Sequence, residues 1–166
     1  LPWIGGSASG AVGAWGQWRD FRAAGSQTGT RPAELWAGAL YGYEEWALGR
    51  VRASGGVRAD RVRVRPLDRT ETALLRGVRE REMGALTGAL TLAVDVAQGA
   101  SVGATVARAF RPPAVEELFS AGPHLASYAY EVGNPSLRPE RGRGAELFAR
   151  LARAGLAVEA SAYVMD

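Results

Sequence analysis

The clearest pattern in the chain is a two-residue alternation of apolar and polar positions. It is sharpest between residues 86 and 95, where large apolar residues alternate with small or polar ones. The apolar set is Leu86, Gly88, Leu90, Leu92 and Val94, and the opposing set is Thr87, Ala89, Thr91, Ala93 and Asp95. A pleated strand sends alternate side chains to opposite faces, so this pattern indicates strands. It predicts seven strands, at about 7–20, 35–46, 50–65, 84–95, 100–110, 143–153 and 156–166.

The lengths of the predicted strands and connections limit the possible fold classes. Several strands exceed the ~5–6 residues usual in soluble sheets and match the ~9–11 residues that cross a bilayer at a tilt. The connections alternate without exception: 21–34, 66–83 and 111–142 are long, whereas 47–49, 96–99 and 154–155 are short. Outer-membrane barrels have tight periplasmic turns and long outer loops. We therefore expect an all-β fold, an antiparallel transmembrane β-barrel segment whose chain enters at the periplasmic side.

Two irregularities concern the face that meets lipid. The strand at 50–65 changes phase near Arg61, because Val62 and Val64 join the parity of the polar residues. A bulge or emergence from the membrane explains such a change. Most strand charges fall on the presumed luminal face, and Arg108 is the exception. It lies near a strand end, where an arginine facing lipid costs ~0–1 kcal/mol instead of the ~2–4 kcal/mol at the midplane.

Aromatic residues gather near the predicted strand ends. Interfacial girdles place tryptophan and tyrosine at such positions. Ordinary packing of aromatic side chains in a core is the alternative interpretation. The residues concerned are Trp15, Trp18, Trp36, Trp46, Tyr41 and Tyr43.

Composition excludes several functions. All 20 basic residues are arginines spread along the chain, whereas a nucleic-acid site needs a clustered basic stripe, so we expect no nucleic-acid partner. The chain has no cysteine and one histidine, which leaves few ways to form a catalytic triad. The glycine-rich stretches lack the Lys and Ser/Thr of a phosphate loop. We expect neither an enzyme nor a cofactor.

Two motifs between residues 111 and 140 resemble the barrel of TonB-dependent receptors. The first is Arg-Pro-Pro-Ala-Val-Glu-Glu-Leu-Phe at 111–119, and the second is Gly-Asn-Pro-Ser-Leu-Arg-Pro-Glu at 133–140. In that family one strand ends in the first motif and the next strand begins after the second. Residues 44–60 also resemble an earlier hairpin of these barrels. The motif residues, to which we assign structural roles, are Arg111, Pro113, Glu117, Leu118, Phe119, Gly133, Asn134, Pro135, Leu137, Pro139 and Glu140.

The residues of this loop predict its local shape. Pro112 and Pro113 end the hydrogen-bond ladder of the preceding strand. Residues 115–119 are expected to form one short helical turn. Asn134-Pro135 and Arg138-Pro139 bend the chain before the next strand. The segment is therefore expected to shape a loop over the barrel mouth.

Five residues of this loop are candidates for ligand binding, namely Glu116, Glu117, His124, Tyr128 and Tyr130. His124 suggests a metal or haem ligand, but one histidine without a second His or Cys nearby cannot build a metal site. We therefore interpret it as a loop residue that caps or packs locally. In the second long loop Asp68, Glu71, Glu80 and Glu82 alternate with arginines, which is typical of a solvated, self-neutralising segment.

The resemblance implies a larger molecule than residues 1–166. Such receptors have a plugged barrel of about 22 strands and a periplasmic segment that engages TonB. Neither the plug nor that segment is recognisable, and the chain ends at Met165-Asp166 without a terminal aromatic residue. Seven strands also leave two open edges, which lipid does not tolerate. We expect a partial barrel domain that does not insert or transport by itself.

The resemblance also implies a function for the complete protein. In the outer membrane of a Gram-negative cell it would bind a scarce small-molecule or metal-complex ligand and import it with energy passed through TonB. Iron-siderophore complexes, haem, metal ions and cobalamin all stay open as ligands. Two alternatives are a porin-like channel, which would have the same strands, and a soluble all-β binding module, which would bury the Leu86 face in a second sheet.

Overall fold

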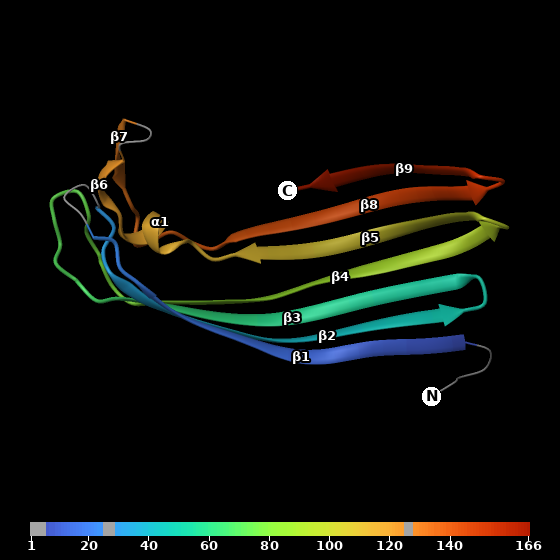
Figure 1. Cartoon of the computed structure of the whole chain (residues 1–166), viewed down its shortest axis with the longest axis horizontal. Coiled ribbons are helices and arrows are strands. Elements are labelled where there is room, and N and C mark those ends of the chain that lie inside the picture. The colour runs from blue at the N-terminus through green and yellow to red at the C-terminus, as the bar shows by residue number, and fades with distance from the viewer. Residues whose placement is uncertain (1–5, 25–28, 125–127) are drawn as a thin grey trace.

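The computed structural model describes residues 6–24, 29–124 and 128–166. Seven strands form one antiparallel sheet in the order β1-β2-β3-β4-β5-β8-β9 (Figure 1). They are β1 (Gly6–Phe21), β2 (Ala33–Leu48), β3 (Val51–Pro66), β4 (Arg81–Ala97), β5 (Ala100–Arg111), β8 (Glu140–Arg153) and β9 (Leu156–Met165). The predicted strands are confirmed, and the largest difference in bounds is three residues, at the start of β4 and of β8.

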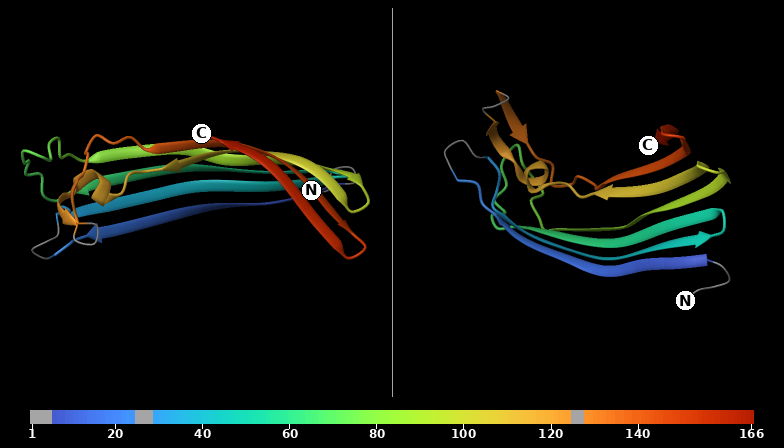
Figure 2. Two further views of the ribbon diagram at one scale, coloured as in Figure 1. Left: turned by 90° about the horizontal axis from the view of Figure 1, so that it is seen from above. Right: turned by 45° about the vertical axis from the view of Figure 1, so that its right-hand side comes forward.

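Tight turns and long loops occupy opposite ends of the sheet (Figure 1). Gly49, Gly99 and Gly155 have φ values of +58°, +74° and +80° in the three tight turns. Only glycine adopts these values without strain, which explains the glycine in each turn. The sheet is bent into an open trough whose edge strands are β1 and β9 (Figure 2). An unclosed stretch of antiparallel barrel wall is therefore the observed fold.

The strand register separates two chemically different faces. We call inner the face that carries the buried strand residues, among them Ala39, Val62, Ala93 and Phe148. The three ion pairs Arg52–Asp95, Arg58–Asp60 and Arg150–Glu159 also lie there. The opposite, outer face exposes large apolar side chains, including Leu40, Val57, Leu86, Leu90, Leu92, Val106, Leu147 and Val158. A polar interior and an apolar exterior are what a membrane barrel requires.

The phase change near Arg61 is not a bulge. Both registers of β3 run without a break past this residue, and among the described strands the register shifts only between Asp95 and Ala97. Val62 and Val64 stay on the inner face, where they are 7% and 0% exposed beneath the loops. The inner-face residues in this part of β3 are apolar because the loops cover them. Of the two explanations given for the phase change, the bulge is wrong, and the strand continues into a loop-covered region.

The aromatic residues divide between the two faces. Trp18 and Trp36 lie on the outer face with ring centroids 5.9 Å apart, and Trp46 lies on the same face ten residues further along β2. At ~3.3 Å per residue and a tilt of ~40°, ten residues correspond to about 25 Å along the membrane normal, the height of a barrel's apolar band. These three tryptophans therefore have the spacing of two girdles.

Trp15, Tyr41 and Tyr43 do not belong to a girdle, because the register places them on the inner face. Two of them bracket the guanidinium of Arg58, which lies 5.4 Å from the Trp15 ring centre and 5.9 Å from that of Tyr41. Parity explains the error: Trp15 and Trp18 are close in sequence but have opposite parity. Proximity to a strand end alone does not distinguish the faces.

The register confirms that Arg108 has the parity of the outer face, since it stands opposite Gly88 of β4 and Arg143 of β8. It is not the sole exception, because Glu44, Arg61 and Arg143 also have that parity. Arg143 lies three residues inside the end of β8, as Trp18 lies three residues inside the end of β1. It is thus near the interface, where the cost of a charge is small.

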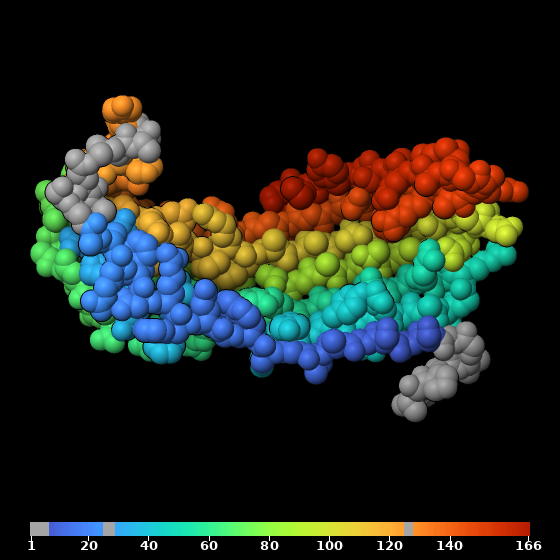
Figure 3. Space-filling model, viewed as in Figure 1, coloured from blue at the N-terminus to red at the C-terminus, as the bar shows by residue number. Residues whose placement is uncertain are grey.

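The long loops gather into one compact mass at their end of the sheet (Figure 3). It contains α1 (Val115–Phe119) and a hairpin of β6 (Ala121–His124) and β7 (Ala129–Val132). The short helix confirms the predicted helical turn, whereas the sequence pattern had not predicted the hairpin. Within the described residues, no helix is long and apolar enough to cross a membrane.

Candidate ligand-binding site

The first motif is held together by one carboxylate. Glu117 accepts hydrogen bonds from Arg111 at 2.7 Å and from the backbone N–H of Ala114 at 2.8 Å, just before α1. Arg111 also pairs with Glu140 across the β5–β8 ladder at 3.1 Å. The guanidinium of Arg111 first, and the Ala114 N–H second, hold the pKa of Glu117 below its ordinary value. Both oxygens of the Glu117 carboxylate are therefore engaged within the motif.

The second motif folds against the first. The backbone N–H of Gly133 donates to the Ser120 carbonyl at 2.7 Å, and that of Asn134 donates to the Glu117 carbonyl at 2.8 Å. A Cβ at Gly133 would come within 2.8 Å of the Ser120 nitrogen, so the close approach requires glycine. The Asn134 side chain accepts from the Ser136 N–H at 2.9 Å, which closes an Asx turn.

Arg81 anchors the second motif to β4. Its guanidinium donates to the carbonyl of Leu137 at 2.8 Å and also to the carbonyl of Pro135. Pro135 is buried and Leu137 packs against the loop core. These contacts join the two motifs to each other and to the sheet, while the structural roles of the motif residues stay a prediction.

A small hydrophobic core joins the loops to the inner face. Its members are Ala33, Val62, Val64, Leu75, Val78, Met83, Val115, Leu118 and Phe119. Leu118 and Phe119 are 0% exposed, and the backbone N–H of Arg31 donates to the Phe119 carbonyl at 3.2 Å. Side chains from two loops and three strands, with a backbone hydrogen bond from the first loop, make this end of the sheet one packed unit. The motif apolar residues are therefore the centre of a loop-end core.

The β6–β7 hairpin carries three of the five candidate ligand residues. His124 Nδ1 lies 3.0 Å from a carboxylate oxygen of Glu131 across the hairpin. Tyr128 is 98% exposed, and Tyr130 is 57% exposed with its hydroxyl donating to the Ala121 carbonyl at 3.2 Å. Glu116 is half-buried on α1. The structure therefore brings His124, Tyr128 and Tyr130 together on one exposed ribbon and leaves both glutamates on the helix.

The acidic residues of the second long loop do not converge. Asp68 contacts Arg31, Glu71 accepts from the Gly77 N–H at 2.7 Å, and Glu80 and Glu82 pair with arginines of β3. The N–H of Thr70, then its hydroxyl, and Arg31 hold the pKa of Asp68 below its ordinary value. The described part of the chain contains no group of three His, Cys, Asp or Glu residues that could hold a metal ion.

A hollow of about 560 Å³ lies on the inner face beside the loop core. It is lined mainly by apolar and aromatic side chains, with few polar groups. The lining residues are Trp15, Gln17, Leu35, Ala37, Arg58, Asp60, Val62, Thr87, Arg108, Ala109, Phe110 and Pro112. The sequence interpretation missed Trp15, Arg58 and Asp60. The register places these three residues on the same face of the sheet as Tyr41. Alternation within each strand, combined with this pairing, could have identified them as neighbours.

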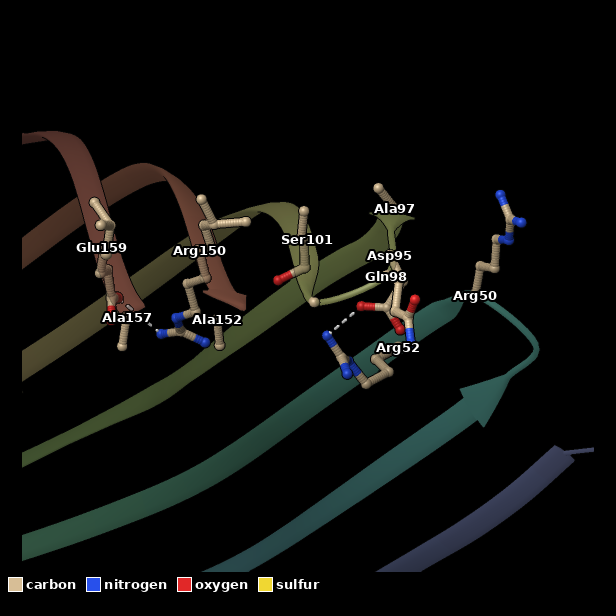
Figure 4. A pocket seen from close by; sticks show the side chains of 14 residues that line it. Arg50, Arg52, Asp95, Ala97, Gln98, Ser101, Arg150, Ala152, Ala157 and Glu159 are labelled. Atoms are coloured by element: carbon tan, nitrogen blue, oxygen red, sulfur yellow. Dashed lines mark hydrogen bonds and ion pairs between the residues drawn. The ribbon is translucent and has the colours of Figure 1, made fainter. Parts of the chain in front are cut away.

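A second, more polar hollow of about 800 Å³ lies at the turn end of the inner face (Figure 4). Arg52 reaches Asp95 at 2.7 Å and Arg150 reaches Glu159 at 3.0 Å within it. These paired charges are adjacent across strands, where opposite charges stabilise a sheet. The turn end of the inner wall is therefore polar and carries two cross-strand ion pairs, unlike the hollow beside the loop core.

Comparison with known families identifies this architecture. The model of the family described as TonB dependent receptor-like, beta-barrel, matches residues 2–166. The chain belongs to this family. Comparison with curated proteins finds no match.

Two solved structures of low sequence identity share the fold. The hemophore receptor HasR of Serratia marcescens, in a double-mutant form with its hemophore HasA and heme, superposes with a TM-score of 0.70 at 18% identity. The copper transporter OprC superposes with a TM-score of 0.65 at 24% identity. The match covers 96% and 80% of this TonB-dependent receptor barrel segment. The segment spans 32% of the HasR chain and 21% of the OprC chain.

Proposed function

We propose that the chain is part of the wall of an outer-membrane receptor that binds a scarce ligand outside a Gram-negative cell and imports it with energy from TonB. The observation that carries this proposal is the family match, which extends over residues 2–166. The apolar outer face, the polar inner face and the interlocked loop motifs of the fold support it.

The proposal includes further strands that cover the two edges of the sheet. β1 and β9 are edge strands, and their outer faces continue the apolar surface. An unpaired backbone edge costs several kcal/mol per group in lipid, so such edges must be paired for the wall to span a bilayer. In the complete receptor, residues 1–166 then form a partial barrel domain, while a plug and a TonB-contacting segment lie elsewhere in the protein.

We assign the first contact with the ligand to the exposed hairpin. His124, Tyr128 and Tyr130 offer one imidazole and two phenol groups on a ribbon that stands away from the sheet (Figure 1). Glu116 on the adjacent helix is the remaining candidate, because Glu117 is committed to Arg111. Contacts outside the hairpin decide which ligand is bound, whether an iron-siderophore, haem, a metal ion or cobalamin.

Uptake by cells that express the complete receptor tests the proposal. Labelled iron-siderophore, heme, copper and cobalamin are each supplied to cells with and without TonB. The proposal predicts that at least one is accumulated only when both receptor and TonB are present. Passage that does not depend on TonB would contradict it and would favour the porin-like channel.

The same uptake assay tests whether the β6–β7 hairpin contacts the ligand. We expect a triple substitution of His124, Tyr128 and Tyr130 to alanine to reduce uptake at limiting ligand concentration. Substitution of the exposed Leu74 in the neighbouring loop to alanine is the matched control, because it is 60% exposed and lies outside the hairpin. Equal uptake by the triple variant and the control would remove the hairpin from the proposal.

A further inference from the structure

Two arginines stand directly opposite each other on the outer face, near the loop end of the sheet. The register pairs Arg108 of β5 with Arg143 of β8, which are neighbouring strands (Figure 1). The next outer-face residue of β8 toward the loops is a third arginine, Arg141, and all three residues are exposed. We call these three residues the arginine cluster. Like charges directly opposite on a sheet are destabilising, so the cluster needs a compensating negative charge.

The neighbouring strands supply little of that charge. On the β4 side Arg108 faces Gly88 and lies diagonal to two leucines. On the β9 side the Asp166 carboxylate accepts a hydrogen bond from the backbone N–H of Arg143 at 3.0 Å. Within the described residues, no carboxylate forms an ion pair with a side chain of the cluster. Three arginines beside one aspartate leave this part of the outer face positively charged.

The outer-face arginines of β3 differ from the cluster, because each of them has an acidic partner. The pairs are Arg61–Glu82 at 2.7 Å, Arg63–Glu80 at 2.6 Å and Arg65–Glu34 at 3.6 Å. Arginines near the loop end of the outer face are thus neutralised within the chain on β3 but not on β5 and β8. The positive charge of the cluster is therefore a local feature and not a property of the whole outer face.

The depth of the cluster corresponds to the boundary between lipid headgroups and hydrocarbon. Arg108 and Arg143 lie three residues inside the loop ends of their strands, as Trp18 and Trp36 do. Tryptophan marks this boundary in membrane proteins. From the cluster toward the turn end, the outer face of β4, β5 and β8 continues as a strip of exposed apolar side chains, namely Leu90, Leu92, Val106 and Leu147. Positive charge at headgroup depth therefore adjoins an apolar strip at the depth of acyl chains.

We propose that the arginine cluster binds the phosphomonoester headgroup of an anionic lipid in the outer leaflet, with the acyl chains of that lipid along the apolar strip. A phosphomonoester has three strong acceptor oxygens, and the planar guanidinium fork of arginine matches phosphate in a bidentate way. The adjoining apolar strip favours a lipid over a soluble anion, because it adds contact with the chains. This inference goes beyond the proposed import function: it needs the outer face to meet lipid but no particular imported ligand.

Native mass spectrometry of the purified full-length receptor tests the headgroup requirement. Dioleoyl phosphatidic acid and dioleoyl phosphatidylcholine have the same acyl chains, and only the first has a phosphomonoester. The proposal predicts that phosphatidic acid binds about tenfold or more tightly, as expected for charge-assisted bonds to arginine. Inorganic phosphate at the same concentration should not displace it. Equal binding of the two lipids, or displacement by inorganic phosphate, would overturn the proposal.

Variants locate the bound lipid. The double variant Arg108→Gln with Arg143→Gln should lose most of the preference for phosphatidic acid. Substitution of both residues by lysine should keep part of it, because the charge is retained but not the planar fork. Arg61→Gln is the matched control, since Arg61 is an exposed outer-face arginine that already pairs with Glu82. A preference that survives the double glutamine variant would overturn the proposal, as would receptor dimers that only this variant abolishes, because they identify a second copy as the occupant.

Thermal unfolding in a nonionic detergent tests the charge repulsion itself. Arg108→Glu places a carboxylate opposite Arg143, so without lipid this variant should unfold at a higher temperature than the native receptor. Phosphatidic acid should raise the unfolding temperature of the native receptor but not that of the variant. An unfolding temperature that Arg108→Glu leaves unchanged or lowers would contradict the repulsion and overturn the proposal. If TonB-dependent uptake persists while the lipid experiments fail, the import proposal stands and the arginine cluster is not a lipid site.

Discussion

At the scale of single residues, the inner face joins aromatic rings to glycines on the neighbouring strand. A Cβ built at Gly103 would overlap the Phe148 ring, and one built at Gly13 would overlap the Tyr41 ring. Phe148 is 8% exposed although it faces the open side of the trough. A ring that covers a glycine restores packing that the missing side chain would otherwise leave empty. Glycine is therefore required at these positions by the cross-strand neighbour.

Gly103→Ala tests this pairing. The added methyl group must displace Phe148 or the Leu92 carbonyl, which would lie 2.6 Å away, so we expect a loss of about 1–3 kcal/mol of unfolding free energy. Gly38→Ala is the control, because its nearest neighbour would be the Trp15 carbonyl at 3.7 Å. Urea unfolding of the full-length receptor in detergent measures both. Equal midpoints for the two variants would show that Phe148 does not depend on Gly103.

The Glu117 carboxylate predicts a pH dependence of the loop. Its pKa is lowered in the folded state by Arg111 and by the Ala114 N–H. A lowered folded pKa contributes stability that is present above the unfolded pKa of about 4.3 and is lost as the pH falls through the folded value. Amide exchange at 112–120, corrected for its intrinsic rate, should therefore accelerate on acidification.

In Glu117→Gln the amides of this segment should exchange at neutral pH as fast as those of the native protein do at low pH. Exchange in this variant should therefore depend much less on pH. Asp68 also has a lowered pKa, so Asp68→Asn is the comparison for a carboxylate outside the motif. If exchange at 112–120 depends on pH equally in Glu117→Gln and in the native protein, Glu117 is not the responsible group.

At the scale of secondary structure, the alternation of apolar and polar residues located the strands. Each strand has one face toward apolar surroundings and the other toward polar surroundings. The same argument failed at Val62 and Val64, since loops far away in sequence cover those positions. Alternation does assign Trp15 and Trp18 to opposite faces, but proximity to the strand end had grouped them. The hairpin at 121–132 was missed because four-residue strands are too short for alternation to be read. Local pattern therefore predicts the sheet, whereas tertiary contacts define the loop core and the hollow.

Phe119→Ala tests whether the loop core is a packed unit. Phe119 is 0% exposed, and truncation of such a core phenylalanine costs about 3–5 kcal/mol. We expect the loop end to become protease-sensitive while the membrane strands stay protected. Tyr128→Ala is the matched control, because Tyr128 is 98% exposed. Protease resistance unchanged by Phe119→Ala would contradict a cooperative core.

At the scale of the whole molecule, the account depends on the two faces of the sheet. One face has tryptophans at two levels with aliphatic residues between them, and the other has ion pairs and both hollows. The family match gives this division its meaning, since a receptor barrel presents its apolar face to lipid and its polar face to the interior. A soluble sandwich would instead bury the Leu86 face against a second sheet.

Spin labelling along β4 tests this division most directly. Because the chain has no cysteine, single cysteines at 86–95 can be labelled in the full-length receptor reconstituted in bilayers, provided that the remainder is made cysteine-free. The account predicts that accessibility to oxygen, which concentrates in lipid, peaks at 86, 88, 90, 92 and 94. Accessibility to oxygen at 87, 89, 91 and 93 should be low. Equal accessibility at both parities, or a maximum at the odd positions, would contradict the barrel wall proposed for this chain.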